Sequence, residues 1–221
     1  MDKMDAVRER HAVRDYTEKP IDSAILTALQ EEINRCNAES GLHIQLISNE
    51  PEAFNGFLAR YGKFNNVRNY IALIGARSSN LDETIGYYGE RIALTAQQLG
   101  LNTCWVAVTF SKRKSKCSIE PGEKLVCVLS LGYGKTQGIP HKSKPMSALF
   151  EGKGAMEDWV QAGMESAMLA PTATNQQNFI VSVRDQKVKI RSTGGFYSRV
   201  DLGIVKYHFE IGAGKENFAW A

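Results

Sequence analysis

The sequence lacks the features that mark several common classes of protein. Its 221 residues include only four cysteines and four histidines. No two cysteines have Cys-x-x-Cys spacing, which argues against a zinc site or a disulfide framework and favours a reducing compartment. The histidines are scattered, so they form no typical metal-binding cluster. We therefore expect a protein that holds no metal.

Membrane and secretion signals are also missing. No apolar run approaches the ~18 residues that a membrane-spanning helix needs. The N-terminal Met-Asp-Lys-Met-Asp lacks the apolar core of a signal peptide. We expect a cytoplasmic protein with no membrane partner.

Nucleotide and nucleic-acid motifs are absent as well. No Gly-x-Gly-x-x-Gly follows a strand-like run, and there is no P-loop, His-Glu-x-x-His or Gly-x-Ser-x-Gly. Gly132-Tyr133-Gly134 lacks the third glycine and a following helix, so it predicts a turn. The net charge of +3 is too small to imply nucleic acid. The one basic run, residues 112–116, has no aromatic residue between its charges, which favours a solvated loop over an anionic partner.

The apolar spacing that is present indicates both helices and strands. Helices are expected after Pro20, after Asn80, and over 156–169 and 200–211, the last stopping at Gly212; Asn80 and Glu83 form a candidate capping box. Strand-like runs cover 43–47, 69–75, 103–108, 125–131, 179–183 and 188–191. The run 69–75 is nearly continuously apolar, as expected for a strand covered on both faces, and 103–108 and 125–131 are expected to be buried as well. The mixture predicts an α+β, three-layer fold with an antiparallel or mixed sheet flanked by helices. We expect two unequal subdomains that share one core, 1–145 and 146–221, with 137–147 as the linker candidate.

A short basic segment near the N-terminus is the first candidate site. Arg10, His11 and Arg14 lie within five residues, and positions 10 and 14 share a side in either a helix or an extended chain. Two arginines so placed can clamp a phosphate, because each guanidinium donates two parallel hydrogen bonds. The alternative is a surface arginine pair that makes ion pairs with Glu9 and Asp15.

A polar segment that carries no charge is the second candidate. Residues 170–179 read Ala-Pro-Thr-Ala-Thr-Asn-Gln-Gln-Asn-Phe and lie between a predicted helix and a predicted strand. Their hydroxyl and amide groups either cap the helix and turn the chain, or face a heteroaromatic ring with donors and acceptors on its edge.

Together these segments resemble the FMN-dependent nitroreductase family. Residues 10–16 are similar to its N-terminal basic motif, and residues 170–179 to its Ala-Pro-Ser-x-x-Asn-x-Gln-Pro-Trp motif. Residues 99–106 are similar to the family's helix end and strand, and 131–144 to its C-terminal strand and basic pair. The resemblance covers nearly the whole chain. Two departures are Ala12, which replaces the usual serine, and Asn178-Phe179, which replaces the usual Pro-Trp.

The order of these motifs differs from that of typical members. In them the Ala-Pro-Ser motif comes soon after the N-terminal arginines, and the flavin lies at the interface of a homodimer. Here that motif follows the basic pair, which resembles the tandem, pseudo-dimeric type of nitroreductase. The resemblance implies one FMN per chain, held by both 1–145 and 146–221, in a monomer or a weak homodimer.

The resemblance also implies roles for individual residues. Arg14 is the candidate for stabilising the negative charge of the reduced flavin. The implied cofactor-binding residues are Arg10, His11, Ala12 and Arg14 for the phosphate, ribityl and pyrimidine end, Lys142 and Lys144 for the phosphate, Val108 and Thr109 for backbone contacts near flavin N5, and Pro171, Thr172 and Asn175 for the ring and its polar edge.

The chemistry implied is that of an NAD(P)H oxidoreductase. NADH or NADPH would deliver hydride to flavin N5, and a nitroaromatic, a quinone or a similar small acceptor would then take the electrons. The flavin needs no catalytic acid, base or nucleophile from the protein. Two alternatives stay open: a non-enzymatic flavin-binding or sensing protein, and a specialised flavin enzyme such as a reductive dehalogenase or an ene-type reductase with a lid near 61–65.

Overall fold

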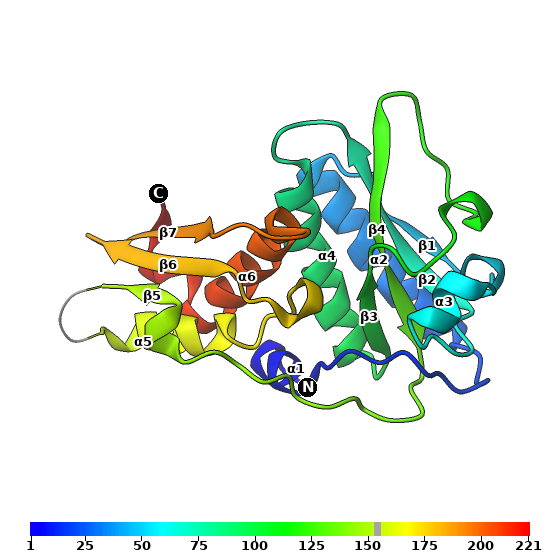
Figure 1. The fold of residues 1–221 in the computed structure, drawn as a ribbon, viewed down its shortest axis with the longest axis horizontal. Helices are drawn as coiled ribbons and strands as arrows, with labels where there is room; N and C mark the ends of the chain where they lie inside the picture. Colours follow the sequence, from blue (N-terminus) through cyan, green and yellow to red (C-terminus); the bar gives the residue numbers. More distant parts are fainter. Residues whose placement is uncertain (153–155) are drawn as a thin grey trace. The chain divides into compact units, whose positions relative to one another are not determined.

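The computed structural model describes residues 1–152 and 156–221. Its helices and strands (Figure 1) are α1 (Lys3–Glu9), α2 (Ser23–Ser40), β1 (Gln45–Ile47), η1 (Glu52–Phe54), α3 (Phe57–Tyr61), β2 (Asn69–Ala76), α4 (Leu81–Gln98), β3 (Asn102–Val106), η2 (Lys112–Lys114), β4 (Glu123–Gly132), η3 (Met146–Ala148), β5 (Phe150–Glu151), α5 (Asp158–Ala167), η4 (Ala173–Asn175), β6 (Phe179–Arg184), β7 (Lys187–Ser192), α6 (Ser198–Ala213), η5 (Lys215–Asn217) and β8 (Ala219–Trp220). Among the described helices, none is both long and apolar enough to cross a membrane.

The chain forms two compact units. The β1–β4 unit comprises Glu9–Leu81 and Arg91–Ile139, and the β5–β8 unit comprises Met1–Arg8, Asp82–Glu90 and Pro140–Ala221. Helix α4 therefore contributes its first half to one unit and its second half to the other. The assignment of separate roles to 1–145 and 146–221 stays a prediction.

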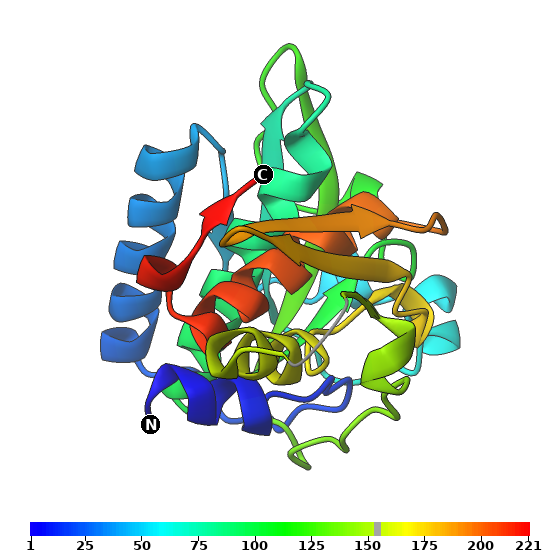
Figure 2. The same cartoon turned by 90° about the vertical axis from the view of Figure 1, so that its left-hand side faces the viewer.

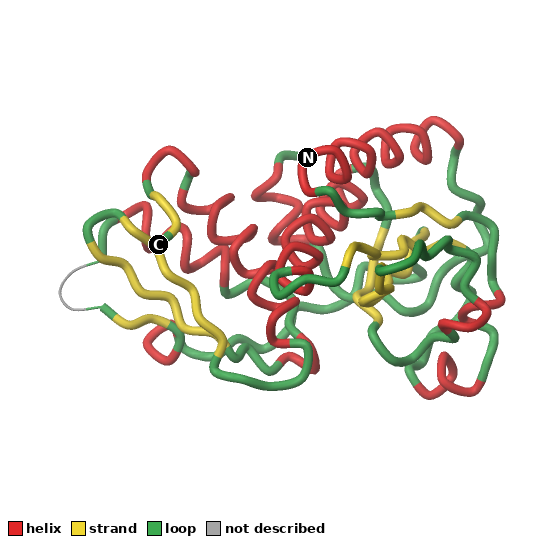
Figure 3. Tube along the Cα trace, turned by 90° about the horizontal axis from the view of Figure 1, so that it is seen from above, coloured by secondary structure: helices red, strands yellow, loops and turns green. Residues whose placement is uncertain are grey.

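The sheet of the β1–β4 unit is antiparallel, with strand order β1-β2-β4-β3. The central strands β2 and β4 pair from Asn69 opposite Leu131 to Ala76 opposite Glu123, with one register shift between Leu73 and Ile74. Both are buried almost throughout, as their continuous apolar runs predicted. Figure 3 shows helices, in red, on either side of this unit's strands, in yellow.

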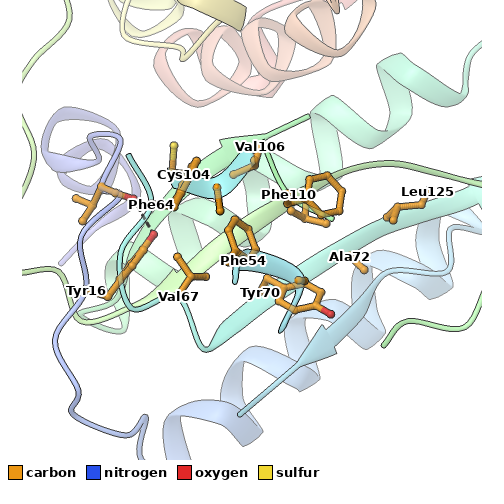
Figure 4. Close-up of a cluster of buried hydrophobic side chains, with 14 of the residues drawn as sticks. Tyr16, Phe54, Phe64, Val67, Tyr70, Ala72, Cys104, Val106, Phe110 and Leu125 are labelled. Atoms are coloured by element: carbon orange, nitrogen blue, oxygen red, sulfur yellow. Dashed lines mark hydrogen bonds between the residues drawn. The ribbon is translucent and has the colours of Figure 1, made fainter. Parts of the chain in front are cut away.

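An aromatic cluster forms the core on one face of that sheet. The ring of Phe54 lies 5.3 Å from that of Phe64, 5.9 Å from that of Tyr70 and 6.1 Å from that of Phe110, measured between ring centroids. Figure 4 shows Phe54 among these side chains, with Tyr16 towards one end of the cluster. Aromatic contacts of this kind add to the free energy of burial, so the segment around Phe54 is firmly attached to the sheet.

The sheet of the β5–β8 unit is mixed, with order β5-β6-β7-β8. The β6–β7 pair is an antiparallel hairpin, whereas β5 and β8 join its two sides as parallel neighbours. In Figure 2 this hairpin lies alongside α6. One antiparallel sheet and one mixed sheet, each with flanking helices, confirm the predicted α+β class. The two-residue strands β5 and β8 were not predicted, because so short a run carries no recognisable pattern.

Glycines let the helices of the β5–β8 unit approach closely. A methyl group on Gly203 of α6 would lie 2.5 Å from the backbone nitrogen of Tyr87 in α4, and closer still to the carbonyl oxygen of Glu83. On the facing helix, a methyl group on Gly86 would collide with the carbonyl oxygen of Val200. These two helices therefore touch backbone to backbone.

Two sequence predictions about helix ends are wrong. Helix α6 does not stop at Gly212 but continues to Ala213, and Gly214 ends it with φ +76°. Gly212 lies inside the helix, and its lack of a side chain makes room for α5, since a methyl group there would collide with the carbonyl oxygen of Ala162. At the start of α4, Asn80 makes no side-chain capping bond; its Oδ1 accepts from the Ser78 hydroxyl, and Glu83 pairs with Lys206.

Candidate functional site

The basic segment after α1 is an extended strand-like stretch in the β1–β4 unit. The Val13 N–H donates to the Thr103 carbonyl at the start of β3 (3.1 Å), and the Arg14 carbonyl accepts from the Asn65 N–H (2.9 Å). Val13 is buried, whereas Ala12 and Arg14 are exposed on either side of it. The backbone therefore fixes this segment while leaving the Arg14 guanidinium accessible.

The two arginines of the predicted clamp have different surroundings. Arg10 is only 4% exposed, whereas Arg14 is exposed, with its guanidinium carbon 5.9 Å from the centroid of the Phe64 ring. Asp15 pairs with Lys135 (Oδ1–Nζ 3.0 Å) rather than with Arg14. Within residues 1–152 and 156–221, Arg14 forms no salt bridge, so the alternative of a surface ion pair does not describe it.

Tyr16 anchors the end of the same segment. Its hydroxyl donates to the Val13 carbonyl (2.7 Å) and lies 2.7 Å from Ser130 Oγ, a buried side chain of β4. Burial raises the pKa of the phenol well above its ordinary value, and the nearby Cys104 acts in the same direction. Tyr16 is therefore neutral, and the two hydrogen bonds of its hydroxyl attach the basic segment to the sheet (Figure 4).

The chain that leaves β4 also lies against this segment. The Thr17 N–H donates to the Tyr133 carbonyl (2.8 Å), and the Lys135 N–H donates to the Asp15 carbonyl (2.9 Å). Further on, Gly138 adopts φ +75°, and a methyl group there would lie 2.7 Å from His11 Cβ. The turn predicted at 132–134 is absent: Gly132 is the last residue of β4, and Gly134 forms an antiparallel bridge with Tyr16, so the chain continues along the basic segment. At Gly138 a glycine allows the close approach.

Val108 and Thr109 lie beyond the end of β3, which is shorter than its predicted range. Val108 is 55% exposed. Thr109 packs against Gly62 at the end of α3, where an added methyl group would lie 2.7 Å from its side chain. The Ser111 N–H donates to the Ala53 carbonyl (2.7 Å). Val108 is therefore exposed and Thr109 half-buried, in a bend that is tied to η1 through Ser111.

In the β5–β8 unit, the predicted basic pair and the predicted polar loop lie side by side. The Lys142 carbonyl accepts from Asn175 Nδ2 (3.0 Å) and from Gln177 Nε2 (2.9 Å). The Lys144 N–H donates to Gln177 Oε1 (2.8 Å). Gln177 is 2% exposed, so its side-chain amide joins the two segments in a buried position.

The two lysines of that pair differ. Lys144 Nζ donates to the carbonyl oxygens of Gln176 (2.7 Å) and Gln177 (3.2 Å) and to Asn178 Oδ1 (3.4 Å). Lys142 is exposed, and within the described ranges its ammonium group has no hydrogen-bond or ion-pair partner. Spacing alone predicted equivalent roles for the two residues.

The polar loop has an unusual backbone. Thr174, Asn175 and Gln177 all have positive φ, at 52°, 57° and 47°. Non-glycine residues rarely adopt this region, and each does so at a cost in free energy. Such conformations persist only where the surroundings hold them, and they cluster at functional sites.

Asp201, in the first turn of α6, holds this loop from a second side. Its Oδ1 accepts from the Ala173 N–H (2.9 Å), and its Oδ2 accepts from Gln176 Nε2 (2.7 Å). Burial raises the pKa of this carboxyl to about 6, while the bonds from Gln176 and Ala173 act to lower it. Asp201 is 5% exposed, so most of its interactions are with the loop rather than with solvent.

The predicted residues thus fall into two groups. The first, in the β1–β4 unit, contains Arg10, His11, Ala12, Arg14, Val108 and Thr109; the second, in the β5–β8 unit, contains Lys142, Lys144, Pro171, Thr172 and Asn175. Gln177 and Asp201 were not predicted as site residues. Gln177 belongs to the polar run that drew attention to the loop, but no sequence pattern connects Asp201 with a segment 28 residues away.

Comparisons with known proteins agree with this arrangement of elements. A family model described as "Putative TM nitroreductase" matches residues 2–213. No curated protein matches the chain. Among solved structures, a protein described as a putative nitroreductase from Thermotoga maritima is 21% identical, with a TM-score of 0.71 over 98% of this chain and 85% of that one.

Two further solved structures resemble part of the chain. One, from Desulfovibrio desulfuricans, is described as a putative nitroreductase in complex with FMN; it is 15% identical, with a TM-score of 0.56 over 70% of this chain and 99% of that one. The other, from Bacteroides thetaiotaomicron, is described as a putative NADH dehydrogenase/NAD(P)H nitroreductase; it is 18% identical, with a TM-score of 0.52 over 66% and 95% of the two chains. At these identities the similarity shows the fold alone.

Proposed function

Since the chain belongs to the family described as "Putative TM nitroreductase", we propose that it is an FMN-dependent NAD(P)H oxidoreductase. Its acceptors are small oxidised compounds such as nitroaromatics and quinones, and it binds one FMN per chain. The observation that carries the proposal is the exposed, unpaired Arg14 on a backbone fixed at both ends. The donor and the cofactor follow from what the Bacteroides and Desulfovibrio proteins are described as binding or using.

The residues of the β1–β4 unit are suited to the phosphate, ribityl and pyrimidine end of FMN. Arg14 offers a guanidinium that needs no prior ion pair to break, and it is assigned to the pyrimidine edge of the ring, where negative charge develops. Arg10 and His11 lie on the same segment. Ala12 offers only its backbone, because it lacks the hydroxyl of a serine. Val108 and Thr109 offer the backbone amides of the bend between β3 and Ser111.

The side chains of the β5–β8 unit fit the ring end and add cationic groups. Pro171 and Thr172 are partly exposed, and Asn175 is exposed with its amide oriented by the Lys142 carbonyl. Lys142 is the better candidate for a phosphate contact, because Lys144 would first have to give up the hydrogen bonds that it makes to the loop.

FMN, when bound, supplies the hydride and electron chemistry itself. The protein's part is to bind and orient the cofactor and to keep a fixed positive charge where negative charge develops. Arg14 is the residue proposed for that charge, because its backbone is held beside β3 and its guanidinium is accessible.

The proposal is tested with purified protein reconstituted with FMN. Bound oxidised flavin should absorb at ~370 and ~450 nm, as the free cofactor does. The absorbance should correspond to one FMN per chain. NADH and NADPH oxidation is then followed with menadione or a nitrofuran as acceptor. Protein that binds FMN without turnover would indicate the alternative, a non-enzymatic flavin-binding or sensing protein. Protein that binds no FMN refutes the proposal.

Replacement of Arg14 by alanine sharpens this test. Loss of a charge-assisted hydrogen bond should weaken FMN binding by about 10- to 100-fold and slow flavin reduction. The matched control is Arg113→Ala, which removes an exposed cation of the same unit. Equal FMN affinity and reduction rate in wild type and Arg14→Ala would remove Arg14 from the site.

A further inference from the structure

The loop of residues 172–178 needs outside support to hold its shape. Three of its non-glycine residues have positive φ, and such conformations are held only when surrounding contacts over-determine them. Four of its backbone amides donate hydrogen bonds: those of Ala173, Asn175, Gln176 and Gln177. Of these four, only the Ala173 N–H donates outside the loop, and its acceptor is Asp201.

Asp201 uses both carboxylate oxygens on this one loop. One oxygen takes the Ala173 backbone N–H and the other takes the Gln176 side chain. The second hydrogen on Gln176 Nε2 goes to the Phe196 carbonyl, 2.7 Å away. This amide therefore cannot turn over without placing its oxygen against two acceptors, so the carboxylate and the Phe196 carbonyl together fix its orientation.

A buried carboxylate is a costly way to hold a loop. Burial of a charge is unfavourable unless hydrogen bonds compensate, and the raised pKa of Asp201 reflects that cost. A neutral asparagine at the same position would accept only one of the two hydrogen bonds and would present its own NH₂ to the other donor. The two converging donors thus require an acceptor with two free oxygens.

We propose that Asp201 is a positioning residue that holds the 172–178 loop in the shape that receives the flavin ring. The claim that this shape receives the flavin rests on the proposed function, since Thr172 and Asn175 are the loop residues assigned to the ring. The claim that Asp201 holds the loop rests on the two hydrogen bonds from Ala173 and Gln176.

Hydrogen exchange of the 172–178 loop tests, without any flavin, whether Asp201 holds the shape of the loop. Asp201→Asn should speed exchange of these loop amides by about tenfold, the order expected from loss of one hydrogen bond to a charged group. Gln176→Ala should have a similar effect from the loop side, and it supplies the test if Asp201→Asn does not fold. Because the two substitutions share the Asp201–Gln176 hydrogen bond, the exchange of the double variant should be slower than the sum of the two single effects predicts. Asp158→Asn, which removes an exposed carboxylate from α5, is the matched control and should leave the loop unchanged.

FMN titration of the same variants tests whether the shape of the loop affects flavin binding. Asp201→Asn and Gln176→Ala should each weaken FMN binding several-fold and change the visible circular dichroism of the bound flavin, whereas Asp158→Asn should not. Folded variants with wild-type exchange in the loop, or effects that add in the double variant, overturn the proposal. Faster exchange with unaltered FMN binding and flavin dichroism also overturns it. If the wild type binds no FMN, the proposed function fails, and the exchange result alone decides whether Asp201 positions the loop.

Discussion

The crossing of α4 and α6 offers a sharp test of the packing that places Asp201. Gly203 lies two residues after Asp201, and its missing side chain allows the backbone contact with Glu83 and Tyr87. A methyl group at Gly203 would lie 2.5 Å from the Tyr87 nitrogen and closer still to the Glu83 carbonyl oxygen. Non-bonded heavy atoms need a separation of roughly 3.5 Å, so Gly203→Ala forces the two helices apart by more than about 1 Å.

The cost follows from the kind of atoms that clash. Overpacking of a core typically costs about 1–3 kcal/mol, and the upper end applies because the neighbours are backbone atoms that cannot rotate away. Alanine regains about 1 kcal/mol through its higher helix propensity. The net expectation for Gly203→Ala is a loss of about 2 kcal/mol in the free energy of unfolding.

Urea unfolding followed by far-UV circular dichroism measures this loss. With a denaturant dependence of about 1–3 kcal/mol per molar urea, the midpoint should fall by roughly 1 M. Gly56→Ala is the control, because nothing lies within 4 Å of a methyl group there and its φ of −172° suits alanine. A midpoint at or above that of the wild type for Gly203→Ala would mean that the helices do not touch as described.

Two further predictions concern single side chains. Tyr16→Phe removes the hydroxyl shared by Val13 and Ser130 and leaves a buried carbonyl without its donor, so the free energy of unfolding should fall by about 2 kcal/mol; an unchanged urea midpoint would contradict the described anchor. For Asp201, the pKa is raised from 3.8 to about 6 in the folded state, so the folded state holds the proton more tightly. This stabilisation is present below pH ~4 and is lost as the pH rises to ~6, at a total of about 3 kcal/mol. Wild type should therefore lose that amount relative to Asp201→Asn across this window, and parallel pH profiles of the two proteins would refute the assignment.

The sequence predicted those parts of the fold that depend on local patterns. The continuous apolar run from Asn69 to Gly75 became the buried central strand β2, because a strand covered on both faces needs apolar residues at every position. Gly100 follows α4 with φ +80°, as a helix-ending glycine should. In both cases the physical cause lies within a few residues of its effect.

Predictions failed where the role of a residue depends on a partner that is distant in the sequence. Gly212 has the sequence signature of a helix end, yet it is an interior residue that makes room for α5. Asn80 and Glu83 have the spacing of a capping box, but Glu83 pairs with Lys206, 123 residues later in the chain. Asp201 has no recognisable signal in the sequence, because its contacts with the loop exist only in the folded chain.

The basic pair at 142–144 shows the same limit within the candidate site. From the sequence, the two lysines of Lys-Ser-Lys are predicted to have the same role, since both follow a strand and flank one serine. In the structure, the backbone of both residues binds Gln177, and the Lys144 ammonium is occupied by the oxygens of the loop. A phosphate at Lys144 would compete with those bonds, whereas a phosphate at Lys142 would meet a solvated cation. The two charges of the motif therefore have different roles. Lys144 stabilises the strained loop, and Lys142 stays available to a ligand.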